Sequence, residues 1–202
     1  MDNKLIKHTN WYHLPNEDAL GRSGINFRHI RLADVYLMYA EAVLEASGDV
    51  TTAMDYIDRV RSRAGVVTLQ KYMDDNGGKF PAMHTSVQIR GRHKFVDPTV
   101  ESVMTHLRRV ERPLELCFEG HRWKDMVRWG VVQEYFDDLL KDEEWRNTFG
   151  AILDLNGTGV GPLFIKERIR PDFILSSQNY SSSQHDYYPI PTQERQNNNM
   201  IQ

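Results

Sequence analysis

The stretch "RHIRLADVYLMYAEAVLEASGD", residues 28–49, sets the fold class of this 202-residue chain. Its apolar residues recur at intervals of three and four, the pattern of one face of an α-helix. The residues on this stripe are Leu32, Val35, Tyr36, Tyr39, Ala40, Val43 and Leu44. Small side chains in the same stretch would let a second helix approach closely; they are Ala33, Ala40 and Ala42. We therefore expect an amphipathic helix that buries this stripe against a neighbouring helix.

The residues that follow predict a second helix, packed antiparallel to the first. Gly48 can end the first helix, and Asp49 or Thr51 can cap the next one. Apolar residues then recur at helical spacing until Gly65, namely Ala53, Met54, Ile57, Val60 and Ala64. Two helices joined by so short a turn form a hairpin of the tetratricopeptide type, which needs neighbours to bury its other face.

The rest of the chain predicts a mainly α fold of tetratricopeptide-like hairpins, with a long loop excursion and a loop-rich tail. We expect a single domain over residues 1–202. Its segments are an irregular lead-in (1–27), a helical core (28–64 and 99–147) interrupted by the loop excursion (65–98), and the loop-rich tail (148–202). Within the excursion, the stretch "TSVQIRGRHKFV" favours a short hairpin about Gly91.

Composition excludes several classes of partner. The formal net charge is -3 and the pI is about 6.2, so bulk charge would not hold a nucleic acid. No stretch reaches the roughly 18 apolar residues of a membrane span, and the opening residues lack the apolar core of a signal peptide. The single cysteine, Cys117, lies in an apolar run, and we expect a buried structural thiol.

A second informative stretch is "ERPLELCFEGHRWKDMVRWG", residues 111–130. Its acids and arginines suit acid/base machinery, a sugar-binding surface, or the polar interior of a helical scaffold. On a regular helix, the residues that share the direction of Leu107 would form a buried stripe; they are Val100, Leu114, Phe118 and Trp129.

The spacing of the charges in this segment favours the scaffold. Oppositely charged side chains three or four residues apart can pair on a helix surface. Such pairs are Arg108 with Glu111, Arg112 with Glu115, Glu119 with Arg122, and Asp125 with Arg122 and Arg128. We therefore expect a structural ion-pair network, formed by Glu111, Glu115, Glu119, Arg122, Asp125 and Arg128.

An enzymatic interpretation has less support. The neighbouring arginines would hold the glutamates ionised, and no general acid in an apolar pocket is visible. The eight histidines show neither His-x-x-x-His nor Glu-x-x-His spacing. No phosphate-binding Gly-x-x-x-x-Gly-Lys element or Gly-x-Ser-x-Gly nucleophile turn occurs. We expect no catalysis, no cofactor and no metal.

Four motifs together resemble the C-terminal part of the SusD/RagB family. They are "RLADVYLMYAEA", the helix ending "DRVRSRAGV", the block "RRVERPLELCFEGHRWKDMVRWG" and a late "YYPIPTQE". The family's most recognisable block is matched by Glu111, Arg112, Glu115, Phe118, Glu119, Gly120, Arg122, Asp125 and Arg128. Its closing element and the tail beyond are matched by Pro189, Ile190, Pro191, Glu194, Asn198 and Gln202. The resemblance covers about residues 27–202.

Three positions depart from the family pattern. Pro113 stands where a helix-favouring residue is usual, so a kink after residue 109 is expected. Arg195 replaces a residue that is usually apolar, and Asn199 replaces a usual proline. The stretch "YYPIP" is expected to run as an extended strap, because proline fixes φ and disfavours helix at the preceding residue.

The resemblance implies a function and a location. Members are surface-exposed lipoproteins of the cell outer membrane that capture nutrients, mostly glycans, for a SusC-like TonB-dependent transporter. This chain would be the C-terminal portion of such a protein, with no signal peptide or lipobox of its own. The implied ligand is a glycan or oligosaccharide and the implied role is non-enzymatic. The alternative is a tetratricopeptide-type protein-interaction scaffold that binds no sugar.

Candidate ligand-binding residues are aromatic side chains that have hydroxyl-binding neighbours. A sugar site needs an aromatic platform against the apolar sugar face, flanked by Asn, Asp, Arg or Gln. Trp11 and Tyr12 have this composition beside Asn10 and His13, as do Trp145 and Asn147 beside Arg146. We expect this chain alone to bind glycans weakly or not at all, because the family's ligand arc is built largely from upstream segments.

Overall fold

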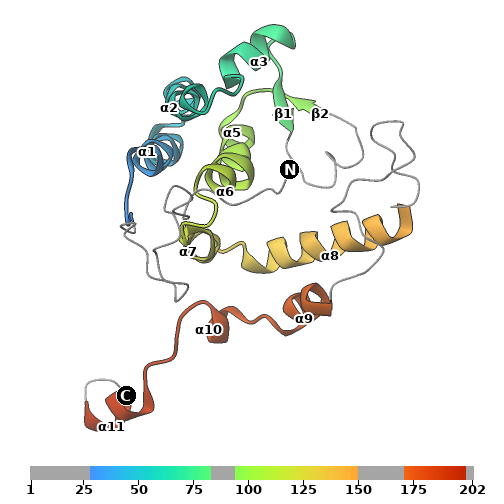
Figure 1. The fold of residues 1–202 in the computed structure, drawn as a ribbon. Helices are drawn as coiled ribbons and strands as arrows, with labels where there is room; N and C mark the ends of the chain where they lie inside the picture. The colour runs from blue at the N-terminus through green and yellow to red at the C-terminus, as the bar shows by residue number, and fades with distance from the viewer. Residues whose placement is uncertain (1–27, 83–93, 150–170, 199–202) are drawn as a thin grey trace, which may run out of the picture. The chain divides into compact units, whose positions relative to one another are not determined.

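The computed structural model describes residues 28–82, 94–149 and 171–198 (Figure 1). These residues are mainly helical, which confirms the expected fold class. The chain divides into two compact units. The first comprises residues 1–84 and 93–122, and the second comprises residues 85–92 and 123–202. The prediction of one domain over 1–202 stays a prediction.

The first unit is built on the expected helical hairpin. Helix α1 (Leu32–Ser47) ends at Gly48, whose φ of 68° is left-handed and whose N–H bonds the carbonyl of Leu44. Helix α2 (Val50–Arg63) begins directly afterwards, with the Asp49 carboxylate accepting from the Thr52 N–H at 3.0 Å. Because only Gly48 and Asp49 join them, the two helices run antiparallel and lie side by side (Figure 1).

The buried face of α1 differs from the stripe expected from its apolar residues. The buried residues are Ala33, Asp34, Leu37, Ala40, Glu41 and Leu44. Leu32, Val35 and Tyr39 belong to the expected stripe but are exposed at 62%, 42% and 46%. The acids explain the rotation, because Asp34 and Glu41 turn inward to ion partners on other elements. A pattern that counts only apolar residues cannot include them.

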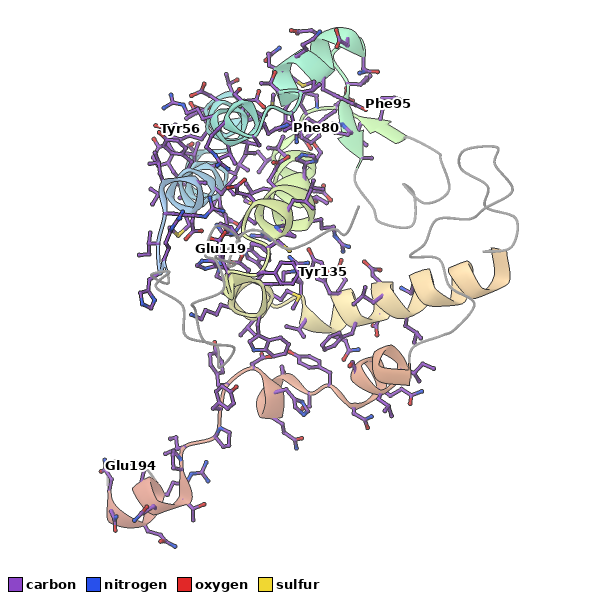
Figure 2. The ribbon with its side chains drawn as sticks, viewed as in Figure 1. Tyr56, Phe80, Phe95, Glu119, Tyr135 and Glu194 are labelled. Carbon is purple, nitrogen blue, oxygen red and sulfur yellow. The ribbon has the colours of Figure 1, made fainter. Side chains whose placement is uncertain are left out.

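The core of this unit joins the hairpin to the elements that follow it. Its buried apolar residues come from α1, α2 and the segments after α2. Those outside α1 are Ala53, Met54, Ile57, Val60, Leu69, Phe80, Val103, Met104 and Leu107. Phe80 is fully buried, and its ring meets the His106 ring edge-on at 5.1 Å (Figure 2). The core positions expected in α2 are therefore confirmed except Ala64, which is exposed.

The excursion expected over residues 65–98 contains regular structure. Helix α3 (Leu69–Asp75) starts where the Asp58 carboxylate of α2 accepts from the backbone N–H groups of Leu69 and Gln70. Strands β1 (Phe80–Ala82) and β2 (Lys94–Val96) then pair antiparallel, with Phe80 opposite Val96. The expected hairpin turn at Gly91 lies outside the described residues.

A π-helical turn interrupts the next helix where the sequence predicts a kink. Helix α5 (Val100–His106) passes into the π-turn η1 (Leu107–Glu111) and then into α6 (Arg112–Glu115). The Arg112 N–H bonds the Leu107 carbonyl, a bond that spans five residues. Pro113 occupies the start of α6, where its missing N–H costs least.

The interruption overturns the buried stripe expected through Leu107. Leu107 is fully buried, but Leu114 is 73% exposed and Phe118 is 64% exposed. A constant rotation per residue fails here because η1 widens one turn, and because the backbone leaves the helix at Phe118, whose φ is 63°. The same turn exposes Cys117, so the expectation of a buried thiol is wrong.

The second unit contains the remaining helices. Helix α7 (His121–Arg128) begins at the boundary between the units, and α8 (Val132–Phe149), α9 (Pro171–Asn179), α10 (Ser182–His185) and α11 (Thr192–Asn197) follow. The tail therefore holds more helix than expected. The "YYPIP" strap, residues 187–191, is non-helical as predicted. Among the described residues, no helix is both long and apolar enough to span a membrane.

Candidate functional site

Charged residues of the 111–130 block meet oppositely charged side chains from the segment before α1, from α1 and from α2 in the first unit. Arg31, which precedes α1, donates from Nη1 to Glu115 Oε1 at 2.5 Å and from Nε to Glu119 Oε2 at 2.7 Å. Its Nη2 also donates to the Glu115 carbonyl oxygen at 2.5 Å. Glu119 lies in the turn that joins α6 to α7, where Figure 2 labels it. Arg31 thus ties the start of α1 to α6 and to the turn after it.

The two carboxylates also set the protonation of Arg31. Burial by itself lowers the pKa of its guanidinium, but hydrogen bonds and the negative charges of Glu119 and Glu115 raise that pKa above its ordinary value. Glu115 has a second partner, because Arg63 at the end of α2 approaches its Oε1 to 2.6 Å. One carboxylate therefore joins three elements of the unit.

A buried ion pair connects α6 to α1. Arg112 Nη1 lies 3.0 Å from Asp34 Oδ1, with the two side chains only 3% and 4% exposed. The pair is close enough for strong charge attraction, although its alignment is not that of a hydrogen bond. Nearer the surface, Arg108 Nη2 lies 2.9 Å from Glu45 and 3.7 Å from Glu41. Both acids of α1 that face inward are thus matched by arginines.

Glu111 is held by a histidine and an arginine. Its Oε1 lies 2.6 Å from His106 Nε2 and also forms an ion pair with Arg61 of α2. Burial alone would raise the pKa of this carboxyl, but the hydrogen bond and charge of His106, together with Arg61, hold it below its usual range. A general acid needs the opposite shift.

The pairing pattern differs in part from the one that the spacing predicts. The Asp125–Arg128 pair is present at 2.9 Å. The partners found for Glu111, Glu115 and Glu119 lie on other elements, up to 88 residues away in the chain. Arg122 donates from Nη1 to the Arg108 carbonyl oxygen at 3.1 Å.

Sequence reasoning missed the residues on the other side of this network. They are Arg31, Asp34, Glu41, Arg61, Arg63 and His106. One signal was present: two acids seven residues apart share one face of an otherwise apolar helix, which is costly unless they are paired. We use the name interhelical network for these residues with Arg108, Glu111, Arg112, Glu115 and Glu119.

Three tyrosines pack across the surface of the α1–α2 hairpin. The rings of Tyr39 and Tyr56 are 4.4 Å apart, and Tyr36 meets Tyr56 edge-on at 5.5 Å (Figure 2). The Arg59 guanidinium lies 4.5 Å above the Tyr56 ring and pairs with Asp55 at 2.8 Å. The three rings and the guanidinium pack on one another, and they reinforce the packing of α1 on α2.

In the second unit, polar contacts hold α8 to α9. The Asp137 carboxylate accepts from Ser177 at 2.6 Å and from Gln133 at 2.8 Å, and these hydrogen bonds lower its pKa. Tyr180 packs edge-on against Phe136 at 5.6 Å and hydrogen-bonds to Asp186. Burial and that hydrogen bond raise the pKa of Tyr180 to about 12.

The residues expected to bind ligand are not placed by the structure. Trp11 and Tyr12 lie outside the described residues. Trp145 and Asn147 fall within α8, but their side chains lie outside the described part. Among the residues that are described, no group of three His, Cys, Asp or Glu could hold a metal ion.

Comparison with known proteins identifies the class to which this chain belongs. The model of the SusD family matches residues 4–202, so the chain belongs to the SusD family. Members of this family are non-catalytic binding proteins of nutrient uptake and are outer-membrane lipoproteins. A similar protein is the SusD-like protein P25 of Formosa agariphila, 32% identical over 111 residues.

The similarity to that relative is partial in both directions. It covers 54% of this chain and 16% of the relative, so the matched part is about a sixth of the relative's length. No solved structure matches the chain. The residues matched by the family model, 4–202, include all residues of the interhelical network.

Proposed function

We propose that this chain is part of a non-enzymatic, nutrient-binding component of an outer-membrane uptake system. Its ligand is a glycan or oligosaccharide, and its partner is a SusC-like TonB-dependent transporter. The protein is surface-exposed and held at the outer membrane as a lipoprotein. The observation that carries this proposal is the SusD family match over residues 4–202.

The interhelical network supports a binding role without catalysis. Each glutamate of the block is paired with a positively charged side chain, and the pKa of Glu111 is lowered. Because the pKa of Glu111 is lowered, this carboxyl is ionised at neutral pH and cannot deliver a proton to a leaving group. We assign Glu111, Glu115, Glu119, Arg122, Asp125 and Arg128 the structural task of fixing the positions of the helices around them.

The proposed ligand contacts are aromatic and amide side chains that the structure does not describe. Trp11 and Trp145 would stack on the apolar face of a sugar ring, while Tyr12 and Asn147 would bond its hydroxyl groups. Sugar affinity comes from several such contacts made together, since each alone leaves little surplus over the cost of association. This is why weak binding is expected when only part of the site is present.

The partner is tested in the cell that makes the protein. An affinity tag is placed on the protein at its native locus, and the outer-membrane fraction is purified and analysed by mass spectrometry. We expect co-purification with a TonB-dependent transporter and cleavage of the tag by protease added to intact cells. A protein found away from the outer membrane, with no transporter, would exclude the proposal.

The ligand is tested on the purified chain with polysaccharides of plant, host and microbial origin. Affinity electrophoresis should show weak retardation by one class, reduced further in Trp11→Ala and Trp145→Ala. Tyr188→Ala is the matched control, because Tyr188 is fully exposed and its loss removes an aromatic ring without loss of packing. Equal loss in all three variants would exclude the assigned contacts. Binding of a protein partner with no effect of any glycan would favour a tetratricopeptide-type scaffold instead.

A further inference from the structure

Helix α1 carries apolar side chains on its outer side as well as on its inner side. Its inner side forms the core, with Leu37 and Ala40 fully buried. We define the outer face of α1 as its exposed residues Leu32, Val35, Met38, Tyr39, Ala42 and Ala46. The four larger ones are 62%, 42%, 41% and 46% exposed in that order. A helix that is hydrophobic on all sides is normally buried on all sides. The outer face therefore has the character of an interface.

The charged residues of α1 do not interrupt this face. Asp34 and Glu41 are buried at 3% and 6% exposure and are matched by Arg112 and Arg108. Glu45, near the C-terminal end, is 62% exposed. From Leu32 to Ala42 the outer face thus presents only apolar side chains. Such a run of exposed apolar residues on one helix marks a protein contact.

The spacing and the sizes of these residues specify how a partner helix would pack. Leu32, Val35, Tyr39, Ala42 and Ala46 follow alternating intervals of three and four, which form the seam of a helix pair. The bulky residues lie in the N-terminal half and the alanines in the C-terminal half. A second α1 running antiparallel therefore sets Leu32 of each copy against Ala42 of the other, whereas a parallel one would set Leu32 against Leu32 and leave a gap at the alanines.

Charge complementarity favours the same arrangement. The segment before α1 exposes two basic residues, Arg28 and His29, and the far end of the helix exposes Glu45, which pairs with Arg108 at 2.9 Å and still leaves 62% of its side chain exposed. In an antiparallel pair, each Glu45 lies next to the basic end of the other copy. The helix dipoles are then also opposed, which is the favourable orientation.

We propose that the outer face of α1 binds the same face of a second copy of this chain, antiparallel, in a two-fold dimer. A single self-complementary patch is the form that two-fold dimers use. In this dimer Leu32 lies opposite Ala42 of the second copy, and Val35 lies opposite Tyr39. The proposal is independent of glycan binding, because neither the interface nor its test involves a sugar.

Sedimentation velocity on the full 202-residue chain tests whether the dimer forms. We expect the proportion of dimer to rise with concentration. Ala42→Glu should weaken self-association by at least about tenfold, because it buries a charge without a partner. Ala64→Glu is the matched control, since Ala64 is exposed and lies outside α1. Circular dichroism should show unchanged helix content in both variants, because both alanines are exposed.

Disulfide trapping tests the orientation. Cys117 is exposed, so it is first replaced by serine, and Leu32→Cys and Ala42→Cys are introduced into separate chains. Mild oxidation of the mixture should give a disulfide between the two kinds of chain in excess of either self-linked product. Self-linked products in excess would indicate parallel packing and overturn the proposal. So would a chain that stays monomeric at all concentrations, because the outer face would then be covered by other residues of this chain or by a different protein.

Discussion

Replacing Arg112 by methionine tests whether the interhelical network holds the first unit together. Arg112 and Asp34 are 3% and 4% exposed and lie 3.0 Å apart. Methionine keeps much of the length and apolar contact of arginine but removes the charge, which leaves the Asp34 carboxylate buried without this partner. Stranding one member of a buried pair costs about 3–5 kcal/mol. For a chain of this size, the lower figure corresponds to a loss of about 6–12 °C in melting temperature.

A double-mutant cycle separates the ion pair from general loss of packing. The variants are Arg112→Met, Asp34→Leu and the two together, each unfolded with urea and followed by circular dichroism. Replacing both charges with apolar groups removes the desolvation cost along with the attraction, so the double variant should be more stable than either single one. Lys71→Met is the matched control, because Lys71 and Asp75 are 64% and 55% exposed and their pair should contribute less than about 1 kcal/mol.

Two results would refute the reasoning. The first is a loss in Arg112→Met no larger than that in Lys71→Met, which would show that the buried charge is not stranded. The second is a double variant destabilised by the sum of the two single losses. Additive losses would show that the side chains contribute through separate contacts and not through each other.

Three further predictions concern protonation and backbone. Because the pKa of Glu111 is lowered, its charge stabilises the fold fully above the ordinary value of 4.5, and this contribution is lost as the pH falls through the lower folded-state pKa. The urea midpoint of Glu111→Gln should therefore fall less steeply below pH 4.5 than that of the unchanged protein. Parallel curves of urea midpoint against pH for the two proteins would contradict this. Pro113→Ala should change the unfolding free energy by less than about 1 kcal/mol, because proline is tolerated in the first turn of a helix; a gain of about 3 kcal/mol would indicate an interior proline. Gly48→Ala should cost about the 1–2 kcal/mol of a left-handed backbone, because its φ is 68° and its Cβ would lie in ordinary contact with Val100 Cγ2 at 3.4 Å. Gly65→Ala (φ 72°) should cost about the same, because a Cβ there meets nothing within 4 Å; a clearly larger melting shift at Gly48 would contradict this.

The hairpin could be predicted from the sequence because its signals are local. Gly48 and Asp49 end one helix and start the next through their own backbone and side-chain bonds. The rotation of α1 was wrong because the inward position of Asp34 depends on Arg112, which is 78 residues away in the chain. A local pattern does not contain that information.

The candidate site also has some features that the local sequence predicts and others that depend on distant residues. Ionised acids could be predicted for residues 111–130, because basic residues lie close to them in the sequence. The partners of Glu115 and Glu119 could not be predicted in this way, because Arg31 reaches them only when α1 packs against α6. The exposed Cys117 and Phe118 were missed because the break in the helix depends on a left-handed residue that is not glycine.

The π-turn η1 is a place where this region can lose one residue without a change of helical register. A turn closed by a bond across five residues holds one residue more than an α-helical turn does. Deleting any one residue between Leu107 and Glu111 would leave a sequence able to form a continuous α-helix. Because the π-turn holds the one residue more that the deletion removes, the side chains after it would keep nearly their present directions, and Glu115 would still face Arg31. A deletion within the regular helix α5 would instead turn every later side chain by about 100° around the helix axis, so we expect a one-residue deletion in η1 to be better tolerated than one in α5.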